Sequence, residues 1–190
     1  MSTLQAVWHQ VEALLSAGIS IIPVRDKETI FHDKVFKAKV PYAGWKLFQT
    51  EIVSKEQLWH DMEQNNTAAI AMVCGKVSGN LEAIDIDVKY QPGIDATLFT
   101  AIKDYYPDLG AKIRVQRSPS GGYHFLYRVA SGAGSGTDAA PGGGVIPGNM
   151  QLACRAANDA EIAASPKRKR VAFIETRGEG GYIMCPPSMG

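Results

Sequence analysis

Two acids at alternate positions are the residues of this chain most suited to chemistry. The run Ile84-Asp85-Ile86-Asp87-Val88 sets Asp85 and Asp87 between aliphatic residues. Successive side chains of a β-strand point to opposite faces, so both carboxylates would share one face. Neighbouring carboxylates repel each other, and a hard divalent cation such as Mg²⁺ or Mn²⁺ offsets that repulsion. The run predicts a metal site, although a strand with one wet face would show the same alternation.

A second group of polar residues lies in a turn that opens on a histidine. The run Ser118-Pro119-Ser120-Gly121-Gly122-Tyr123-His124 contains a proline and paired glycines. Such residues allow positive φ angles and a close backbone approach, which suits either a hairpin or a phosphate near the amides. A strand histidine between aromatic residues is often structural, but this turn favours a functional His124. The turn from Ser120 through Gly121 and Gly122 to His124 is therefore both a connection between strands and a candidate phosphate-binding element.

A third acid follows an apolar strand near the C-terminus. The run Phe173-Ile174-Glu175-Thr176-Arg177 puts Glu175 and Arg177 on one strand face. Arg177 could therefore contact a phosphate or pair with a carboxylate, and the two residues could equally form a surface pair of small consequence. Glu179 is a rival acid, but Glu175 is preferred because of the apolar strand before it.

The charge of the chain is balanced, so binding to a polyanion needs local patches. The formal net charge is +1 over 190 residues, of which 45% are hydrophobic and 21% charged. The run Lys167-Arg168-Lys169-Arg170 is a candidate contact to a phosphate backbone, with Lys39 as a weaker one. Short basic runs are more often solvated segments, so this interpretation stays open.

Composition also narrows the class of protein. The content of apolar residues suits one compact domain, and Cys74, Cys154 and Cys185 lack C-x-x-C spacing. These features argue against a disulfide framework and a structural zinc site and favour a reduced, cytoplasmic compartment. No run approaches the roughly 18 apolar residues that a membrane span needs.

Hydrophobic periodicity predicts the elements that must position these residues. A glycine turn between 73 and 81 predicts that the strands on either side of it form an antiparallel hairpin. A Lys-bearing loop is expected from 24 to 45, and a flexible Gly/Ala-rich loop at 131–149. Helices are predicted over 3–17, 54–64 and 94–107, and strands over 19–24, 69–73, 81–88, 112–117, 123–129, 150–154, 171–176 and 182–184.

Taken together, these motifs resemble the bifunctional DNA primase/polymerase N-terminal domain, the prim-pol branch of the archaeo-eukaryotic primase superfamily. The resemblance spans nearly the whole chain. It rests on the acid-x-acid of Asp85 and Asp87, the turn from Ser120 to His124, and the lone acid Glu175. Weaker matches are Ile22-Pro23, Lys39-Val40-Pro41, Trp45, the segment from Gly148-Asn149 to Leu152-Ala153, and Cys185-Pro186-Pro187-Ser188.

The resemblance implies an α/β (α+β) fold, with an RRM-like mixed or antiparallel catalytic sheet, a smaller N-terminal α/β lobe and a cleft between them. Residues 1–190 would form a single two-lobed domain excised from a longer chain with a helicase or accessory region. A plasmid or phage context in a prokaryote would fit such a chain.

The implied activity is primer synthesis and extension by two-metal nucleotidyl transfer. Asp85, Asp87 and Glu175 would hold Mg²⁺ or Mn²⁺, and Ser120, Gly121, Gly122, His124 and Arg177 would bind an NTP or dNTP. The partners would be single-stranded or primed DNA and a helicase domain or subunit, with no membrane.

Two other functions fit the same residues. The domain could be a non-catalytic DNA-binding module of a replication initiator, or the carboxylates could serve a metal-dependent nuclease. The preference between ribonucleotides and deoxyribonucleotides, the template sequence for initiation and the oligomeric state leave no mark in the sequence.

Overall fold

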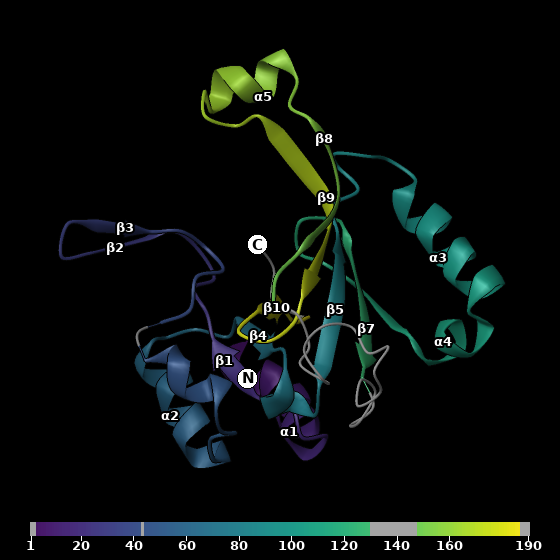
Figure 1. Cartoon of the computed structure of the whole chain (residues 1–190). Helices are drawn as coiled ribbons and strands as arrows, with labels where there is room; N and C mark the ends of the chain where they lie inside the picture. Colours follow the sequence, from purple (N-terminus) through teal and green to yellow (C-terminus); the bar gives the residue numbers. More distant parts are fainter. Residues whose placement is uncertain (1–2, 43, 130–147, 187–190) are drawn as a thin grey trace.

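The computed structural model of this chain describes residues 3–42, 44–129 and 148–186. These residues form a mixed α/β fold with five α-helices, two antiparallel sheets and a separate two-stranded ribbon (Figure 1). No helix in this part of the chain has the length and apolar character needed to cross a bilayer.

The smaller sheet carries the N-terminal part of the chain. Its strands are β1 (Ile21–Pro23), β4 (Ile70–Val73) and β10 (Tyr182–Met184), in the antiparallel order β1-β4-β10. Helices α1 (Thr3–Ser16) and α2 (Lys55–Gln64) pack their apolar residues against it. Ser54 is the N-cap of α2, because its hydroxyl accepts a hydrogen bond from the backbone N–H of Gln57 at 3.2 Å.

The larger sheet has five antiparallel strands in the order β6-β7-β5-β9-β8. One face is covered by α3 (Ile94–Tyr105), and α4 follows at Pro107, where the longer helix was expected to end (Figure 1). Pro107 occupies the first turn of α4, where a missing N–H costs nothing. The strands are β5 (Leu81–Ile86), β6 (Arg114–Arg117), β7 (Tyr123–Arg128), β8 (Gln151–Ala156) and β9 (Arg170–Arg177), and α4 ends at Lys112.

Strand β5 is the element that joins the two halves of the molecule. Leu81 and Ala83 are buried in the core under the smaller sheet, whereas Ile86, on the other face, packs under α3. Asp85 continues the row of Leu81 and Ala83 at the point where that core ends. The alternation predicted from the sequence therefore places Asp85 on the face that looks toward the smaller sheet.

The predicted hairpin between strands 69–73 and 81–88 is wrong. Strand β4 pairs with β1 and β10, whereas β5 pairs with β7 and β9, so the two strands belong to different sheets. An isolated bridge between Gly75 and Leu81 and a 3₁₀ turn (Lys76–Ser78) lie at the crossing. Both strands are buried on two faces, and such strands need neighbours from distant parts of the chain.

The 24–45 segment, which was expected to be a loop, and the segment between β8 and β9 both form projecting elements. The 24–45 segment contains a ribbon of β2 (Thr29–Phe31) and β3 (Lys34–Phe36), followed by a 3₁₀ helix (Trp45–Gln49). The outer ends of β8 and β9 pair only with each other and carry α5 (Asp159–Ala164), which begins in a capping box at Asn158 (Figure 1). We call residues 151–174, with this helix, the arm.

A flexible loop was predicted at 131–149, and residues 131–147 of it lie outside the described part of the chain. Its last two residues are placed: the Gly148 carbonyl accepts a hydrogen bond from Thr176 Oγ1 at 3.1 Å. Thr176 Oγ1 also accepts from the Met150 N–H at 3.0 Å, so β9 fixes the chain that enters β8. Pro187 and Ser188 of the closing motif also lie outside the described part of the chain.

Candidate functional site

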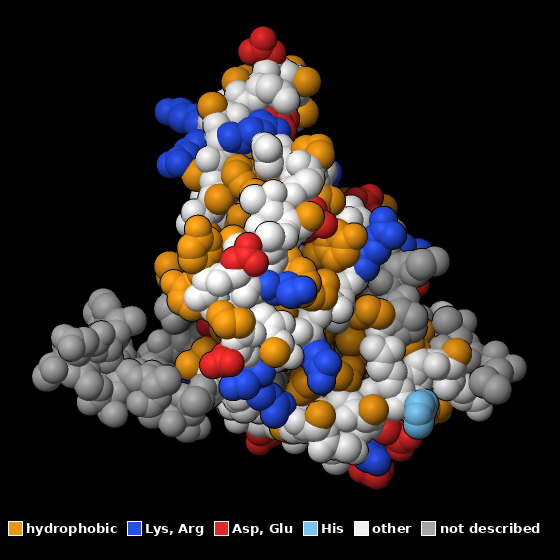
Figure 2. Space-filling view, turned by 90° about the vertical axis from the view of Figure 1, so that its right-hand side faces the viewer, with side chains coloured by type: hydrophobic (Ala, Val, Ile, Leu, Met, Phe, Trp, Pro, Cys, Tyr) orange, Lys and Arg blue, Asp and Glu red, His pale blue; other side chains and the backbone are white. Residues whose placement is uncertain are grey.

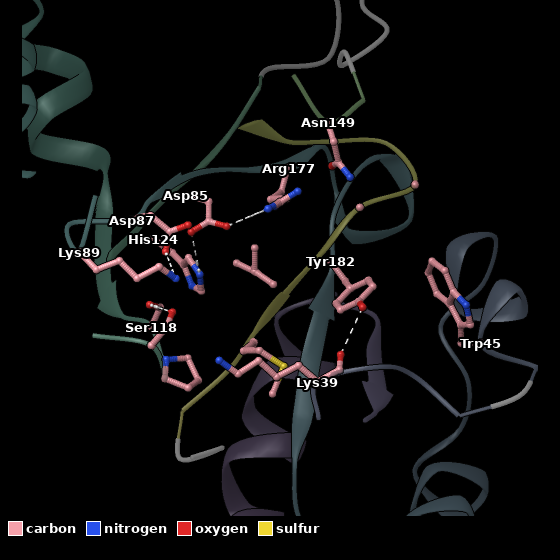
Figure 3. Close-up of a pocket in the computed structure, with 16 residues that line it drawn as sticks. Lys39, Trp45, Asp85, Asp87, Lys89, Ser118, His124, Asn149, Arg177 and Tyr182 are labelled. Carbon is pink, nitrogen blue, oxygen red and sulfur yellow. Dashed lines mark hydrogen bonds and ion pairs between the residues drawn. The ribbon is translucent and has the colours of Figure 1, made fainter. Parts of the chain in front are cut away.

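A pocket of about 480 Å³ lies between the two sheets (Figure 3). The large sheet contributes side chains from β5, β7 and β9, and the smaller sheet contributes the whole of β10. The lining residues are Lys39, Trp45, Asp85, Asp87, Lys89, Ser118, Pro119, Ser120, His124, Asn149, Arg177, Gly180, Gly181, Tyr182, Ile183 and Met184. Thus Asp85, Asp87, Ser120, His124, Arg177 and Lys39, which were predicted as site residues, come together in one place.

Four polar residues form a row across the large sheet at this pocket. The register pairs Gln116 with His124, His124 with Asp85, and Asp85 with Glu175. Directly opposite residues of antiparallel strands point to the same face, so the row crosses β6, β7, β5 and β9 on one side of the sheet. Glu175 therefore lies beside Asp85 although 90 residues separate them in the sequence.

Arg177 joins the two acids of that row. Its Nη2 lies 3.0 Å from Asp85 Oδ2 and 2.7 Å from Glu175 Oε2, and its Nε lies 3.3 Å from the same Asp85 oxygen. Burial favours the neutral form of Arg177, but the two carboxylates outweigh it and raise the pKa of the guanidinium. The carboxylate pairing anticipated for Arg177 is thus present, and Glu175 faces the arginine and does not line the pocket.

Glu179, the other candidate acid, makes a structural contact outside the row of polar residues. Its carboxylate accepts a hydrogen bond from the Lys76 backbone N–H at 2.9 Å, and it packs against Gly75. Glu179 therefore ties the 178–181 turn to the crossing between β4 and β5. The acid next to Asp85 is Glu175, as the apolar strand before it predicted.

His124 is nearly inaccessible but reaches the pocket edge. Its Nε2 lies 3.6 Å from Asp85 Oδ1, and its Nδ1 lies 2.7 Å from the side-chain nitrogen of Gln116. Burial lowers the pKa of His124 below its ordinary value, and Asp85 only partly offsets this effect. Burial thus favours the neutral imidazole, which offers a hydrogen bond without bringing a charge.

The two glycines of the turn before His124 serve different needs. Gly121 has a φ of +86°, a conformation that glycine adopts without strain. Gly122 has no positive φ, but a Cβ there would collide with the carbonyl oxygen of Ile86 on β5. The close backbone approach expected for this turn is therefore an approach to β5. The Ser118 N–H donates to the Gly122 carbonyl at 2.8 Å and closes the turn, which leaves Ser120 exposed at the pocket.

Cations face the acids from the rim. Lys89 Nζ lies 3.2 Å from Asp87 Oδ1, and Lys39 enters from the opposite side (Figure 3). Lys39 is held with a φ of +69°, an uncommon conformation for a residue with a side chain. Its N–H donates to the Arg25 carbonyl at 2.7 Å and its carbonyl accepts from Tyr182 Oη at 3.2 Å, so the strained backbone is fixed on both sides.

Asp85 and Asp87 suit a hard divalent cation that is held by two carboxylates and completed by other ligands. Among the described residues, no three or more His, Cys, Asp or Glu side chains are arranged to hold a metal ion. Asp85 and Asp87 nevertheless line the same pocket with carboxylate oxygens, the donors that Mg²⁺ and Mn²⁺ prefer. Mg²⁺ is commonly held by one or two carboxylates with substrate phosphates and water completing its shell, and this donor set suits that arrangement.

The basic run 167–170 does not line the pocket. Lys167, Arg168 and Lys169 connect α5 to β9 and Arg170 begins that strand, and all four side chains are exposed. Figure 2 shows Lys and Arg side chains on the upper part of the molecule, over the arm, and further ones lower on the same face. The run is therefore placed as a surface patch outside the site.

Several residues of the site were missed from the sequence. Lys89 continues the alternation of Asp85 and Asp87, and Ser118 lies in the same turn as Ser120, so both had a local signal. Gln116 had none, because its contacts join strands far apart in the chain. Asn149 lies in a segment on which the family resemblance rests, but no role was predicted for it.

The chain was compared with curated proteins and with models of protein families. None of the curated proteins searched matches it. The family model described as bifunctional DNA primase/polymerase, N-terminal, matches residues 11–190. This match covers nearly all of the chain, including the two aspartates, the histidine turn and the third acid, so the chain belongs to the bifunctional DNA primase/polymerase N-terminal (Prim-Pol) family.

Proposed function

We propose that this domain synthesises and extends DNA primers by template-directed nucleotidyl transfer with two divalent cations. The proposal depends on one observation: four polar side chains line the same pocket. Asp85 lies on β5, His124 on β7 and Arg177 on β9, and Asp87 follows the end of β5. Membership of the Prim-Pol family supports a primase and polymerase activity.

The pocket has an acidic side and a side rich in hydrogen-bond donors, as a metal-bound nucleotide requires. Asp85 and Asp87 would hold Mg²⁺ or Mn²⁺, with Glu175 as the third acid once Arg177 turns to phosphate. When bound, the cations supply charge stabilisation for the attacking 3′-hydroxyl and the leaving pyrophosphate. Ser120, His124, Arg177 and Lys39 would contact the triphosphate, with the amides of Gly121 and Gly122 nearby.

The larger sheet would act as the RRM-like catalytic sheet, and the smaller sheet with α1 and α2 as the second lobe. The pocket between the sheets supports this assignment. DNA would pass across the open side of the pocket, with Lys167, Arg168, Lys169 and Arg170 as contacts to its backbone. A helicase domain or subunit as partner stays a prediction.

Primer extension with Mg²⁺ or Mn²⁺ tests the proposal. Asp85→Asn and Asp87→Asn should each lower nucleotide incorporation by about a thousandfold, since a bound cation contributes several kcal/mol to the transition state. Asp104→Asn, an exposed acid on α3 that does not line the pocket, is the matched control. Full activity in either pocket variant would refute the proposal.

Nucleotide binding separates synthesis from the alternatives. Isothermal titration with a nucleotide and Mn²⁺ should show binding that is lost in His124→Ala. A nuclease or a non-catalytic DNA-binding module has no need to bind a free triphosphate, so absence of binding in the unmodified protein would favour those functions. Synthesis without a primer distinguishes a primase from an enzyme that only extends.

A further inference from the structure

Gln116 makes two hydrogen bonds from one side-chain nitrogen, and together they fix the chemistry of its neighbour. Gln116 Nε2 lies 2.8 Å from the backbone carbonyl oxygen of Met184 and 2.7 Å from His124 Nδ1. A carbonyl oxygen can only accept, so the amide atom facing Met184 must be the NH₂ group. An amide NH₂ only donates, so His124 Nδ1 must accept and carries no proton.

A neutral imidazole whose Nδ1 accepts has its single proton on Nε2. In this protein Nε2 is the nitrogen nearer to Asp85, at 3.6 Å from Oδ1, on the pocket side. Gln116 therefore selects which hydrogen bond His124 can offer to the pocket: an N–H and not a lone pair.

We propose that Gln116 is a positioning residue that locks His124 in the neutral tautomer with Nε2 protonated and directs this N–H toward the pocket. The lock also joins the two sheets, because Gln116 lies on β6, the edge of the large sheet, and Met184 on β10, the edge of the small one. The role of this N–H in binding a triphosphate rests on the proposed function, because a phosphate oxygen in the pocket would need a hydrogen-bond donor there.

The tautomer can be measured in the protein alone. Two-bond ¹H–¹⁵N correlation spectra of the histidine-labelled protein near pH 8 distinguish a protonated Nε2 from a protonated Nδ1. The chain has four histidines, and His124→Gln identifies the signal. We expect His124 as the pure Nε2–H form. A Nδ1–H form, or a mixture of both, in the unmodified protein would overturn the proposal even before any variant is made.

Substitution of Gln116 tests the cause. Gln116→Met keeps the length of the side chain but removes the donor, so His124 should become a mixture of tautomers. Gln116→Glu turns the donor into an acceptor and should favour the Nδ1–H form. Gln10→Met is the matched control, because Gln10 donates in the same way to Cys185 Sγ, at 3.3 Å, outside the pocket. An unchanged tautomer in both Gln116 variants contradicts the proposal.

Nucleotide titration then separates this proposal from the proposed function. If the pocket binds a triphosphate, Gln116→Met should raise the dissociation constant about five- to tenfold, the worth of one well-directed hydrogen bond. A change of tautomer in a protein that binds no nucleotide would support the positioning role of Gln116 and refute the nucleotidyl-transfer function.

A second inference comes from the ribbon of β2 and β3, which projects from the body (Figure 1). Ile30 lies opposite Val35 in the register, and their exposed fractions are 72% and 59%. Phe31 is 61% exposed. Within the described residues the ribbon joins neither sheet, so these apolar side chains contribute little to the core of the chain.

The base of the ribbon is held by contacts of Arg25. The Arg25 guanidinium carbon lies 4.4 Å from the ring centres of both Phe36 and Tyr42, and Arg25 Nη1 donates to Thr29 Oγ1 at 2.6 Å. Strand β3 ends at Phe36, three residues before Lys39, which lines the pocket. Whatever the ribbon binds is thus placed next to the site.

Lysines accompany the apolar side chains. Lys34 lies opposite Phe31 on one face of the ribbon, and Lys37 is exposed just beyond its end. Lysine is depleted in the apolar centre of protein interfaces, whereas apolar and basic side chains together are typical of contacts to a DNA groove. We infer that this ribbon binds the DNA that passes the pocket, with Ile30 and Val35 on one face and Phe31 on the other against sugars and bases and the lysines on phosphates. This inference rests on the proposed function.

DNA binding by surface variants tests the ribbon. Ile30→Ser with Val35→Ser should weaken the binding of primed DNA by at least about tenfold, because both side chains lose apolar burial. Lys34→Gln with Lys37→Gln should reduce the slope of log affinity against log salt by about 1.8. Tyr105→Ser with Tyr106→Ser, exposed at 79% and 66% at the end of α3, is the matched control.

Equal affinities for DNA in the ribbon and control variants would overturn the inference. So would loss of self-association in the ribbon variants with unchanged DNA binding, since the ribbon would then contact a second copy of the chain. Primer extension by the unmodified protein is measured alongside. If the protein extends primers and the ribbon variants bind DNA with unchanged affinity, the inference about the ribbon is refuted and the proposed function is not.

Discussion

Arg177 holds Asp85 through a single oxygen: both Nε, at 3.3 Å, and Nη2, at 3.0 Å, donate to Oδ2. The other oxygen, Oδ1, faces His124. Because Nη2 also reaches Glu175 at 2.7 Å, the guanidinium lies between the two carboxylates. Arg177 thus offsets the repulsion between Asp85 and Glu175 with a positive charge of the protein itself.

Replacement of Arg177 should therefore change two affinities in opposite directions. In Arg177→Gln, Mn²⁺ alone should bind more tightly, because the competing charge is gone. The nucleotide should bind about 10- to 100-fold more weakly, since charge-assisted hydrogen bonds to phosphate are lost. Isothermal titration measures both. Arg155→Gln is the control, because Arg155 makes a similar two-pronged pair with Glu161, at 2.9 and 2.8 Å, in the arm. A parallel decrease of both affinities would contradict this view.

The two glycines of the histidine turn should respond differently to alanine. Gly121→Ala meets open space and should cost about 1 kcal/mol through its left-handed backbone alone. Gly122→Ala places a methyl group on the Ile86 carbonyl and should cost about 1–3 kcal/mol and move the turn away from β5. Urea unfolding measures stability, and nucleotide titration should show a larger loss for Gly122→Ala. Equal binding by both variants would show that the approach to β5 does not position the site.

The basic run on the arm should increase the salt dependence of DNA binding. Conversion of Lys167, Arg168, Lys169 and Arg170 to Gln should lower the slope of log affinity against log salt by up to about 3 for single-stranded DNA, if all four contact phosphates. Binding of a free nucleotide should not change, because the run lies outside the pocket. Lys103→Gln with Lys112→Gln on α3 and α4 controls for overall charge. An unchanged slope would mean that the run is merely solvated.

Glu82 should make stability depend on pH. This carboxyl group is 7% exposed and lies opposite Tyr127, and burial raises its pKa above the ordinary value of 4.5. Below pH 4.5 the group is neutral in both states. As pH rises through the folded-state pKa, ionisation favours the unfolded chain and stability is lost. Glu82→Gln should therefore gain in stability relative to the unmodified protein as pH rises above 4.5, as measured by urea unfolding at each pH.

Glu56 provides the control of opposite sign. Hydrogen bonds from its own backbone N–H and from Ser54, in the first turn of α2, lower the pKa of its carboxyl group. Its contribution to stability is present at neutral pH and disappears as pH falls through the folded-state pKa, so Glu56→Gln should lose stability at pH 7 relative to acid. The same pH trend in both variants would refute the assignment to burial.

The sequence by itself determined the local geometry of the site. Alternation along residues 84–88 placed the aspartates, and the Ser-Gly-Gly turn led to a hairpin of β6 and β7 with His124 on its second strand. These features depend on backbone preferences and on a period of two residues, which act within a few positions of the chain. The same reasoning put Glu175 and Arg177 on one face of one strand.

The tertiary structure decided which strands are neighbours, and through this the site itself. The glycine turn after β4 resembled a hairpin, but the pairing of β5 with β7 and β9 brought Asp85 beside both His124 and Glu175. It also turned Arg177 toward the acids and gave Gln116 its two acceptors. Strands buried on both faces carry no local signal of their partners, because their register is set by packing between segments far apart in the chain.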